Sequence, residues 1–305
     1  PTGGAPKKYN IRINGVMKMN PEYMSWQESR AGAAGTATSL PNSAQALPVV
    51  SSMVDHMQLN DDLGTNIPLS EATDATIEMM QDSEFCADAG MSPNTMVDEL
   101  GSVLSKYEVP MGLMNKLMML TEFHALEFII DNSGSMLCDT DSNDPITHRP
   151  ISHWKEAQLR LKEMIKILAY VPFNRVVVEF LNRRDQVILT RQGWAPALFI
   201  QDANCKIDAV FARGPAGTTP ALEKLQESLI RGQGRSIACY FFGDGTPNGG
   251  EGAKKEIVNI LMHRQDPAGN PITFISCTNE DDQVEWMKEA EELVPYCSKS
   301  DDFKA

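Results

Sequence analysis

The chain has 305 residues, of which 42% are hydrophobic and 22% charged, proportions that are ordinary for a globular protein. Its formal net charge of −14 disfavours nonspecific nucleic-acid binding and docking on anionic lipid, because both need a basic surface. No apolar run reaches the ~18 residues that a transmembrane helix requires, so we expect no membrane insertion.

The six cysteines form no Cys-x-x-Cys pair and show no zinc-ligand spacing. Reduced thiols in a cytoplasmic setting are therefore the favoured interpretation, and the N-terminal stretch has no apolar signal core. The five histidines are scattered, and none lies at metal-ligand spacing from another. We interpret His124, His148, His153 and His263 as surface or core residues and not as catalytic bases.

Residues 1–91 show little hydrophobic periodicity, and we expect an irregular segment that wraps the main domain or acts as a linker. Within it, residues 9–15 alternate like a short strand. Residues 92–122 predict a short helical pair. Ser92 is the expected N-cap of the first helix, Pro93 lies in its first turn, and Pro110 begins the second.

From residue 123 to residue 305, predicted strands alternate with predicted helices, which indicates βαβ units. The expected fold is α/β: a doubly wound, Rossmann-like, mostly parallel sheet flanked by helices. The predicted strands are 125–130, 175–181, 186–190, 237–242 and 272–276, with 186–190 an antiparallel edge strand and a further strand after 294. The predicted helices are 153–170, 207–211, 220–229, 251–263 and 282–293, and a polar loop runs from Ser135 to Pro150. The expected core residues are Phe128, Ile129, Val177, Val178, Cys239, Phe241 and Phe274.

The first strand of this region ends on Asp131, and two hydroxyl side chains follow at Ser133 and Ser135. A carboxylate with nearby hydroxyls suits Mg2+, which takes oxygen ligands and keeps several waters. The carboxyl ends of parallel strands are also where open α/β sheets bind their ligands. By itself this short pattern fits a polar strand-to-helix turn without metal better than it fits a cation site, because Ser and Gly are common in turns.

Residues 131–135 form an Asp-x-Ser-x-Ser pattern, which resembles the metal-ion-dependent adhesion site (MIDAS) of von Willebrand factor A (vWA) domains. Residues 217–222 and 237–245 resemble that family's Gly-Gly-Thr-Pro-Leu segment and its strand ending in Thr-Asp-Gly. One departure is Gly243, which stands where the family usually has threonine. The resemblance covers residues 123–305, and it implies that the family's usual final helix is missing here.

The resemblance implies one Mg2+ ion, replaceable by Mn2+ or Ca2+ in vitro, with these ligands: Asp131, Ser133, Ser135, Thr219 and Asp244. Because only two of these side chains are charged, the ion stays electrophilic and keeps an open position. The carboxylate of an acidic residue on a protein partner would complete its shell. The implied function is an intracellular protein–protein interaction module.

Two alternatives share these residues: a metal-dependent hydrolase and a vWA scaffold with a vestigial metal site. The sequence pattern identifies no catalytic base or nucleophile, so an enzyme is not the favoured interpretation. Residues 139–144 are acidic but lack the glycine and glutamate of a calcium loop. Residues 249–254 are glycine-rich but lack the Gly-Lys-Ser/Thr of a phosphate loop.

Overall fold

The computed structural model describes residues 10–13, 16–19, 76–78, 80–81, 84–106, 114–143, 148–191, 193–278 and 280–300. Most of the segment predicted to be irregular, residues 1–91, lies outside these ranges. Within it, strand β1 (Asn10–Ile13) pairs antiparallel with β2 (Val16–Met19). The strand predicted at residues 9–15 is therefore confirmed over residues 10–13.

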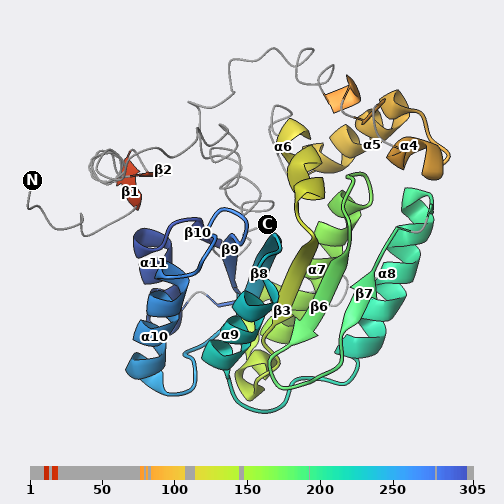
Figure 1. The fold of residues 1–305 in the computed structure, drawn as a ribbon. Helices are drawn as coiled ribbons and strands as arrows, with labels where there is room; N and C mark the ends of the chain where they lie inside the picture. The colour runs from red at the N-terminus through yellow and green to blue at the C-terminus, as the bar shows by residue number, and fades with distance from the viewer. Residues whose placement is uncertain are drawn as a thin grey trace, which may run out of the picture.

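A six-stranded sheet forms the centre of the molecule, in the order β10-β9-β8-β3-β6-β7 (Figure 1). Its strands are β3 (Ala125–Ile130), β6 (Val176–Phe180), β7 (Val187–Leu189), β8 (Ile237–Gly243), β9 (Ile272–Ser276) and β10 (Cys297–Ser300). All neighbours are parallel except β6 and β7, so the predicted antiparallel edge strand is confirmed. After β3 the chain builds β6 on one side and later β8 on the other. The winding direction therefore reverses between β3 and β8, where open α/β sheets bind ligands.

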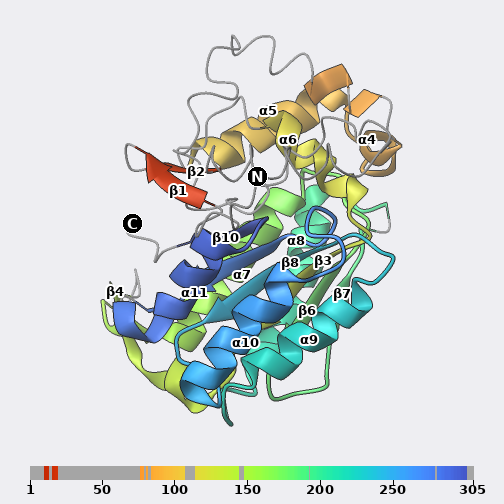
Figure 2. The ribbon, with the colours of Figure 1, turned by 60° about the vertical axis from the view of Figure 1, so that its left-hand side comes forward.

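Helices cover both faces of this sheet (Figure 2). One face carries α7 (His153–Leu168) and α8 (Pro196–Phe211), and the other carries α9 (Ala221–Arg231), α10 (Gly250–Met262) and α11 (Asp281–Leu293). Successive strand residues point to opposite faces, so Phe128 packs under α7 while Ile129 packs under α9. Helices bury both faces, which is why these strands are mainly hydrophobic, with Glu127 and Glu179 as charged exceptions. All seven core residues predicted from the sequence are buried.

Three short elements lie over the end of the sheet where β3 begins, opposite the loops that follow β3 (Figure 1). They are α5 (Pro93–Ser105), α6 (Met114–Met118) and the 3-10 turn η3 (Met119–Glu122), and the one-turn helix α4 (Phe85–Asp88) lies nearby. Ser92 caps α5 as predicted, since its side chain accepts from the Thr95 amide. The buried face of α5 joins the same apolar cluster as α7 and α8. The division at residues 91/92 and 122/123 stays a prediction.

Two predicted segments differ from the structure. The helix expected at 207–211 is α8, which begins at Pro196. Its buried residues recur about every fourth position, so the signal was present: Phe199, Ala203, Ile207 and Phe211. The polar loop expected between Ser135 and Pro150 contains a 3-10 turn, η4 (Gly134–Leu137), and a pair of antiparallel strands, β4 (Asp139–Asn143) and β5 (Pro150–Ser152). These strands lack apolar alternation, which is the pattern by which a half-buried strand is recognised.

None of the helices in the described part of the chain has the length and apolar character needed to cross a membrane.

Candidate metal site

The loop that follows β3 brings three polar side chains to the carboxyl end of the sheet. Asp131 is fully buried, and its Oδ1 atom accepts a hydrogen bond of 2.7 Å from the Ser133 amide. This bond closes a tight turn of the kind that aspartate favours. The Ser133 and Ser135 hydroxyl oxygens then lie 2.9 Å apart. Two hydroxyls are therefore gathered directly beside one carboxylate.

Asp244 reaches the same point from the end of the neighbouring strand, β8. Its Oδ1 atom accepts a 2.9 Å hydrogen bond from the Ser135 hydroxyl, across 109 positions of sequence. The Asp131 backbone amide donates a 2.8 Å hydrogen bond to the Phe242 carbonyl, which joins the end of β3 to the end of β8. The structure thus brings together four of the five side chains that the sequence predicted as ligands, at the reversal of winding between β3 and β8.

The fifth predicted residue, Thr219, lies in a loop that is bonded to the Asp131 turn through its backbone. The Gly134 amide donates to the Gly217 carbonyl at 3.2 Å, and the Ala216 amide donates to the Asn132 carbonyl at 2.7 Å. Thr219 itself is buried. The metal-ligand role of all five residues stays a prediction.

Asparagine side chains that the sequence reasoning did not consider hold these loops in place. The Asn248 side chain donates to the Thr218 hydroxyl and accepts from the Thr219 backbone amide. The backbone amide of Asn248 donates to the Thr219 carbonyl. Asn182 donates to the Thr218 carbonyl and to Asn132 Oδ1. The Thr218 hydroxyl is thus occupied by Asn248, which favours Thr219 as the residue that faces the site. No local sequence signal identifies these asparagines, because their partners lie 29 to 50 positions away.

Burial dominates the electrostatics of Asp131. The pKa of this carboxyl is raised to about 7, chiefly by burial; the Ser133 hydrogen bonds lower the pKa and the nearby Asp244 carboxylate raises it. The second oxygen, Oδ2, is buried without a hydrogen-bond partner. Buried polar atoms are almost always satisfied, so an orphan oxygen here calls for a donor, a water or a cation. The donor set and this orphan atom fit a hard divalent ion.

The site is poor in charged ligands. In the described part of the chain, no three His, Cys, Asp or Glu side chains gather closely enough to hold a metal ion among themselves. A cation at Asp131 and Asp244 therefore depends on the serine and threonine hydroxyls and on water. That composition is suited to Mg2+ or Mn2+, and it is not that of a zinc or iron centre.

His153 also contacts the candidate site, which the sequence reasoning did not predict. Its Nδ1 atom lies 2.9 Å from Asp244 Oδ2, and the residue is buried at the first position of α7. It was interpreted as a surface or core histidine because its partner lies 91 positions away in the chain.

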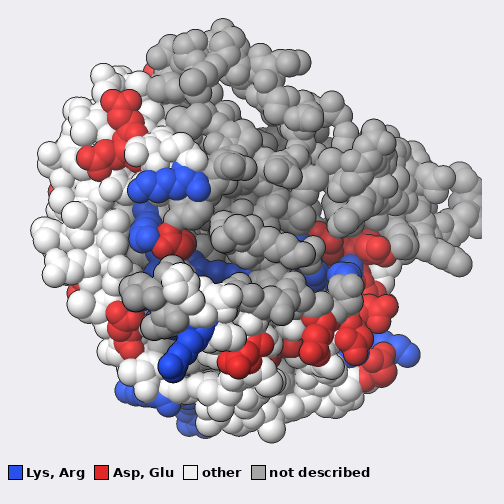
Figure 3. Space-filling view, turned by 180° about the vertical axis from the view of Figure 1, so that it is seen from behind, with Lys and Arg blue, Asp and Glu red and all other residues white. Residues whose placement is uncertain are grey.

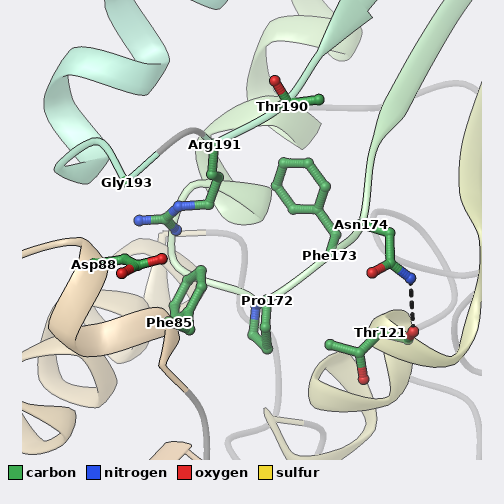
Figure 4. Close-up of a pocket in the computed structure, with 9 residues that line it drawn as sticks. All are labelled: Phe85, Asp88, Thr121, Pro172, Phe173, Asn174, Thr190, Arg191 and Gly193. Atoms are coloured by element: carbon green, nitrogen blue, oxygen red, sulfur yellow. Dashed lines mark hydrogen bonds between the residues drawn. The ribbon is translucent and has the colours of Figure 1, made fainter.

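A second candidate is a cavity of about 440 Å³ beside α4, lined by Phe85, Asp88, Thr121, Pro172, Phe173, Asn174, Thr190, Arg191 and Gly193 (Figure 4). The Arg191 guanidinium lies 4.0 Å from the centre of the Phe85 ring and donates to the carbonyls of Ala169 and Trp194. Burial lowers the pKa of Arg191 to about 10, so it is still cationic at neutral pH. These contacts join α4 to the loop after β7 and serve packing.

Comparison with known proteins gives distant similarities only. No family model and no curated protein matches the chain. Among solved structures, it is similar to manganese-loaded Plasmodium vivax TRAP protein, with a TM-score of 0.32, 16% identity, and coverage of 55% of this chain and 64% of that one. It is also similar to an uncharacterized membrane spanning protein from Vibrio fischeri, with a TM-score of 0.23, 11% identity, and coverage of 50% and 70%.

Proposed function

We propose that the chain is a vWA-type protein-interaction module that binds an acidic residue of a partner through a divalent cation. The observation that supports this most directly is the orphan Oδ2 of Asp131, buried beside a chain of hydrogen bonds from Ser133 through Ser135 to Asp244. A cation would satisfy that oxygen and offset the repulsion between the two carboxylates, which amounts to about 1–4 kcal/mol at ~4 Å.

The residues that would hold the ion are Asp131, Ser133, Ser135, Thr219 and Asp244. When bound, the ion supplies an electrophilic centre whose remaining positions can accept an oxygen from outside the chain. The two aspartates balance the charge of the ion, and the hydroxyl ligands add no further negative charge. A carboxylate from a partner is then the best-matched further ligand.

The proposal places the protein in a reducing compartment such as the cytoplasm. All six cysteines are free, including the exposed Cys138 and Cys205. Exposed free thiols are typical of reducing compartments and would be prone to oxidation outside them.

Isothermal titration with Mg2+ and Mn2+ tests the site. We expect one bound ion in the parent chain and a loss of at least about tenfold in affinity for Ser133→Ala, because a ligand hydroxyl is removed. Ser102→Ala is the matched control, since Ser102 is an exposed serine on α5, at the other end of the sheet. Equal metal uptake by the parent and Ser133→Ala would refute the site assignment.

Partner binding is tested by capture from a native lysate in Mg2+, with EDTA and Ser133→Ala as parallel arms. Partners that are lost in both arms support the proposed interaction. Hydrolysis of phosphoesters or peptides that requires Mn2+ and Ser133 would instead identify a metal-dependent hydrolase. Metal uptake without either result would leave the cation as a structural ion and contradict the interaction role.

A further inference from the structure

We propose that His153 is a positioning residue that sets the selectivity of this site for Mg2+ and Mn2+ over Ca2+. The inference rests on the proposed metal site and concerns how many oxygens Asp244 can offer. A carboxylate accepts hydrogen bonds and donates none, so at 2.9 Å the His153 Nδ1 atom carries the proton and donates it to Asp244 Oδ2.

Hydrogen bonds of the backbone fix the start of α7, from which the His153 side chain extends. His153 is the first residue of α7, where Ser152 is the N-cap and accepts from the Lys155 amide. The His153 amide donates to the Cys138 carbonyl at 3.0 Å, which ties the helix start to the end of η4. The side chain is 11% exposed and the partner carboxylate only 1%. Because His153 is buried and its backbone is anchored, its side chain can hold the Asp244 carboxylate in one orientation.

Both oxygens of Asp244 therefore accept a hydrogen bond. Oδ2 is held by His153, and Oδ1 faces Ser135 and is the oxygen on the side of the hydroxyl cluster. In Asp131, Oδ1 accepts from the Ser133 amide, and Oδ2 is the oxygen without a hydrogen-bond partner. Each carboxylate can thus give the cation one oxygen.

This limit acts differently on the two kinds of cation. Mg2+ requires a near-octahedral shell and is satisfied by single carboxylate oxygens with hydroxyls and waters. Ca2+ takes six to eight oxygens and often binds carboxylates through both of them. A site whose carboxylates are each restricted to one oxygen penalises Ca2+. Ligand-orienting partners of this kind typically change metal affinity by 10–100-fold.

The experiment compares the dissociation constants of Mg2+, Mn2+ and Ca2+ in the parent chain, His153→Leu and His153→Asn. Leucine removes the donor but keeps an apolar side chain at the start of α7. Asparagine carries an amide N–H on its γ carbon and can replace Nδ1 as the donor. His263→Leu is the matched control, because His263 Nδ1 donates to the Asn259 carbonyl within its own segment and is exposed.

We expect His153→Leu to reduce the preference for Mg2+ over Ca2+ by about tenfold or more, because Oδ2 of Asp244 is released. His153→Asn should recover most of the parent preference, and His263→Leu should retain all of it. In the metal-free parent, ¹⁵N NMR of the imidazole should show the proton on Nδ1 of His153.

Three results would overturn the inference. If His153→Leu binds all three ions with the parent's ratios, or weakens them equally without rescue by asparagine, His153 has only a structural role. If the parent binds metal but NMR finds Nδ1 of His153 unprotonated, the hydrogen bond is misassigned. If the parent binds no divalent ion at all, the proposed function fails together with this inference.

Discussion

Asp131 combines full burial with an oxygen that has no hydrogen-bond partner, so its protonation contributes to the stability of the metal-free protein. Its pKa rises from 3.8 to about 7 on folding, chiefly because burial disfavours the charged form. In the metal-free state, the folded chain therefore retains a proton at this carboxyl over a pH range in which the unfolded chain has lost it. Stability must fall as pH rises through that range.

We predict that Asp131 contributes a loss of roughly 4 kcal/mol in unfolding free energy between about pH 4 and pH 7 in EDTA, with no further change above that range. Asp131→Asn is neutral at every pH and should lack this contribution, so it should be the more stable protein at pH 8. Urea denaturation of both proteins across this range measures the difference. Parallel stability curves for the two proteins would show that Asp131 has an ordinary pKa.

Gly217 is a residue whose backbone no other amino acid can reproduce easily. Its φ angle is +110°, and a Cβ atom there would lie 2.7 Å from the Asn182 side chain that braces the Thr218 carbonyl. Gly214 in the same loop has φ +69°, and a Cβ there would meet nothing within 4 Å. Substitution of Gly214 therefore tests backbone strain alone, and substitution of Gly217 tests backbone strain together with a steric clash.

We predict that Gly214→Ala costs about 1 kcal/mol, because alanine tolerates the left-handed region at that cost. Gly217→Ala should cost roughly 2 kcal/mol more and should weaken Mg2+ binding, since the Thr219 loop must move away from Asn182. Thermal denaturation and metal titration of the pair measure both effects. Equal costs for the two substitutions would show that Asn182 gives way freely.

At the scale of elements, α9 is fixed to the sheet by charge as well as by apolar contact. Glu127 of β3 and Glu179 of β6 are both buried on the face that α9 covers. Arg231 lies 2.7 Å from Glu127 and 3.2 Å from Glu179, and Lys224 lies 2.6 Å from Glu179. Ser228 also donates to Glu127. Burial raises the pKa of Glu127, and Arg231 is the largest influence that opposes this rise.

We predict that Arg231→Met destabilises the fold by about 3 kcal/mol, because it leaves Glu127 buried without its cation. The value is at the lower end for buried pairs, since the Arg231 side chain is 33% exposed. Arg235→Met, at an exposed position just after the helix, should change stability by less than about 0.5 kcal/mol. Chemical denaturation of both variants makes the comparison. A small effect of Arg231→Met would mean that α9 is held by its apolar contacts alone.

The elements that could be predicted from the sequence are those with a strong local signal. The strands β3, β8 and β9 are mainly apolar runs bounded by turn residues, and α5 begins at a serine cap that forms as expected. The strands β4 and β5 had no such signal, because they are short and mainly polar and show no apolar alternation. The prediction for helix α8 was too short because the residue at its N-cap, Ala195, has no side chain that can cap the helix.

The candidate site divides in the same way. The predicted ligand residues lie in short motifs at strand ends, so their convergence follows from the parallel topology. The residues that orient them, such as His153 and Asn248, contact the motifs across long sequence separations and from other elements. Only the folded chain shows which histidine or asparagine meets which loop, because one residue type occurs at many positions.

At the scale of the whole molecule, a net charge of −14 complicates any test of metal binding. Acidic side chains gather along one side of the described surface when it is viewed from behind (Figure 3). Divalent ions screen such a surface and can stabilise the fold without entering a site. A specific site must therefore be separated from general screening.

We predict that Mg2+ at about 100 times its dissociation constant stabilises the parent by about 2.7 kcal/mol. Asp131→Asn should gain only the smaller amount that NaCl of equal ionic strength provides to both proteins. Thermal melts in the two salts measure this difference. If Asp131→Asn gains as much from Mg2+ as the parent does, any bound ion lies elsewhere.

The β4–β5 pair has a further consequence. It joins Ser135 to His153, and both ends of this segment contact the same carboxylate, that of Asp244. The exposed Leu137 and Cys138 lie at its base, next to the cluster of hydroxyls. Because the segment is anchored at both ends, its outer part can change in length at little entropic cost. The surface around the proposed site can therefore vary while the aspartates and serines stay the same, so the proposed partner can change without a change in the proposed ligands.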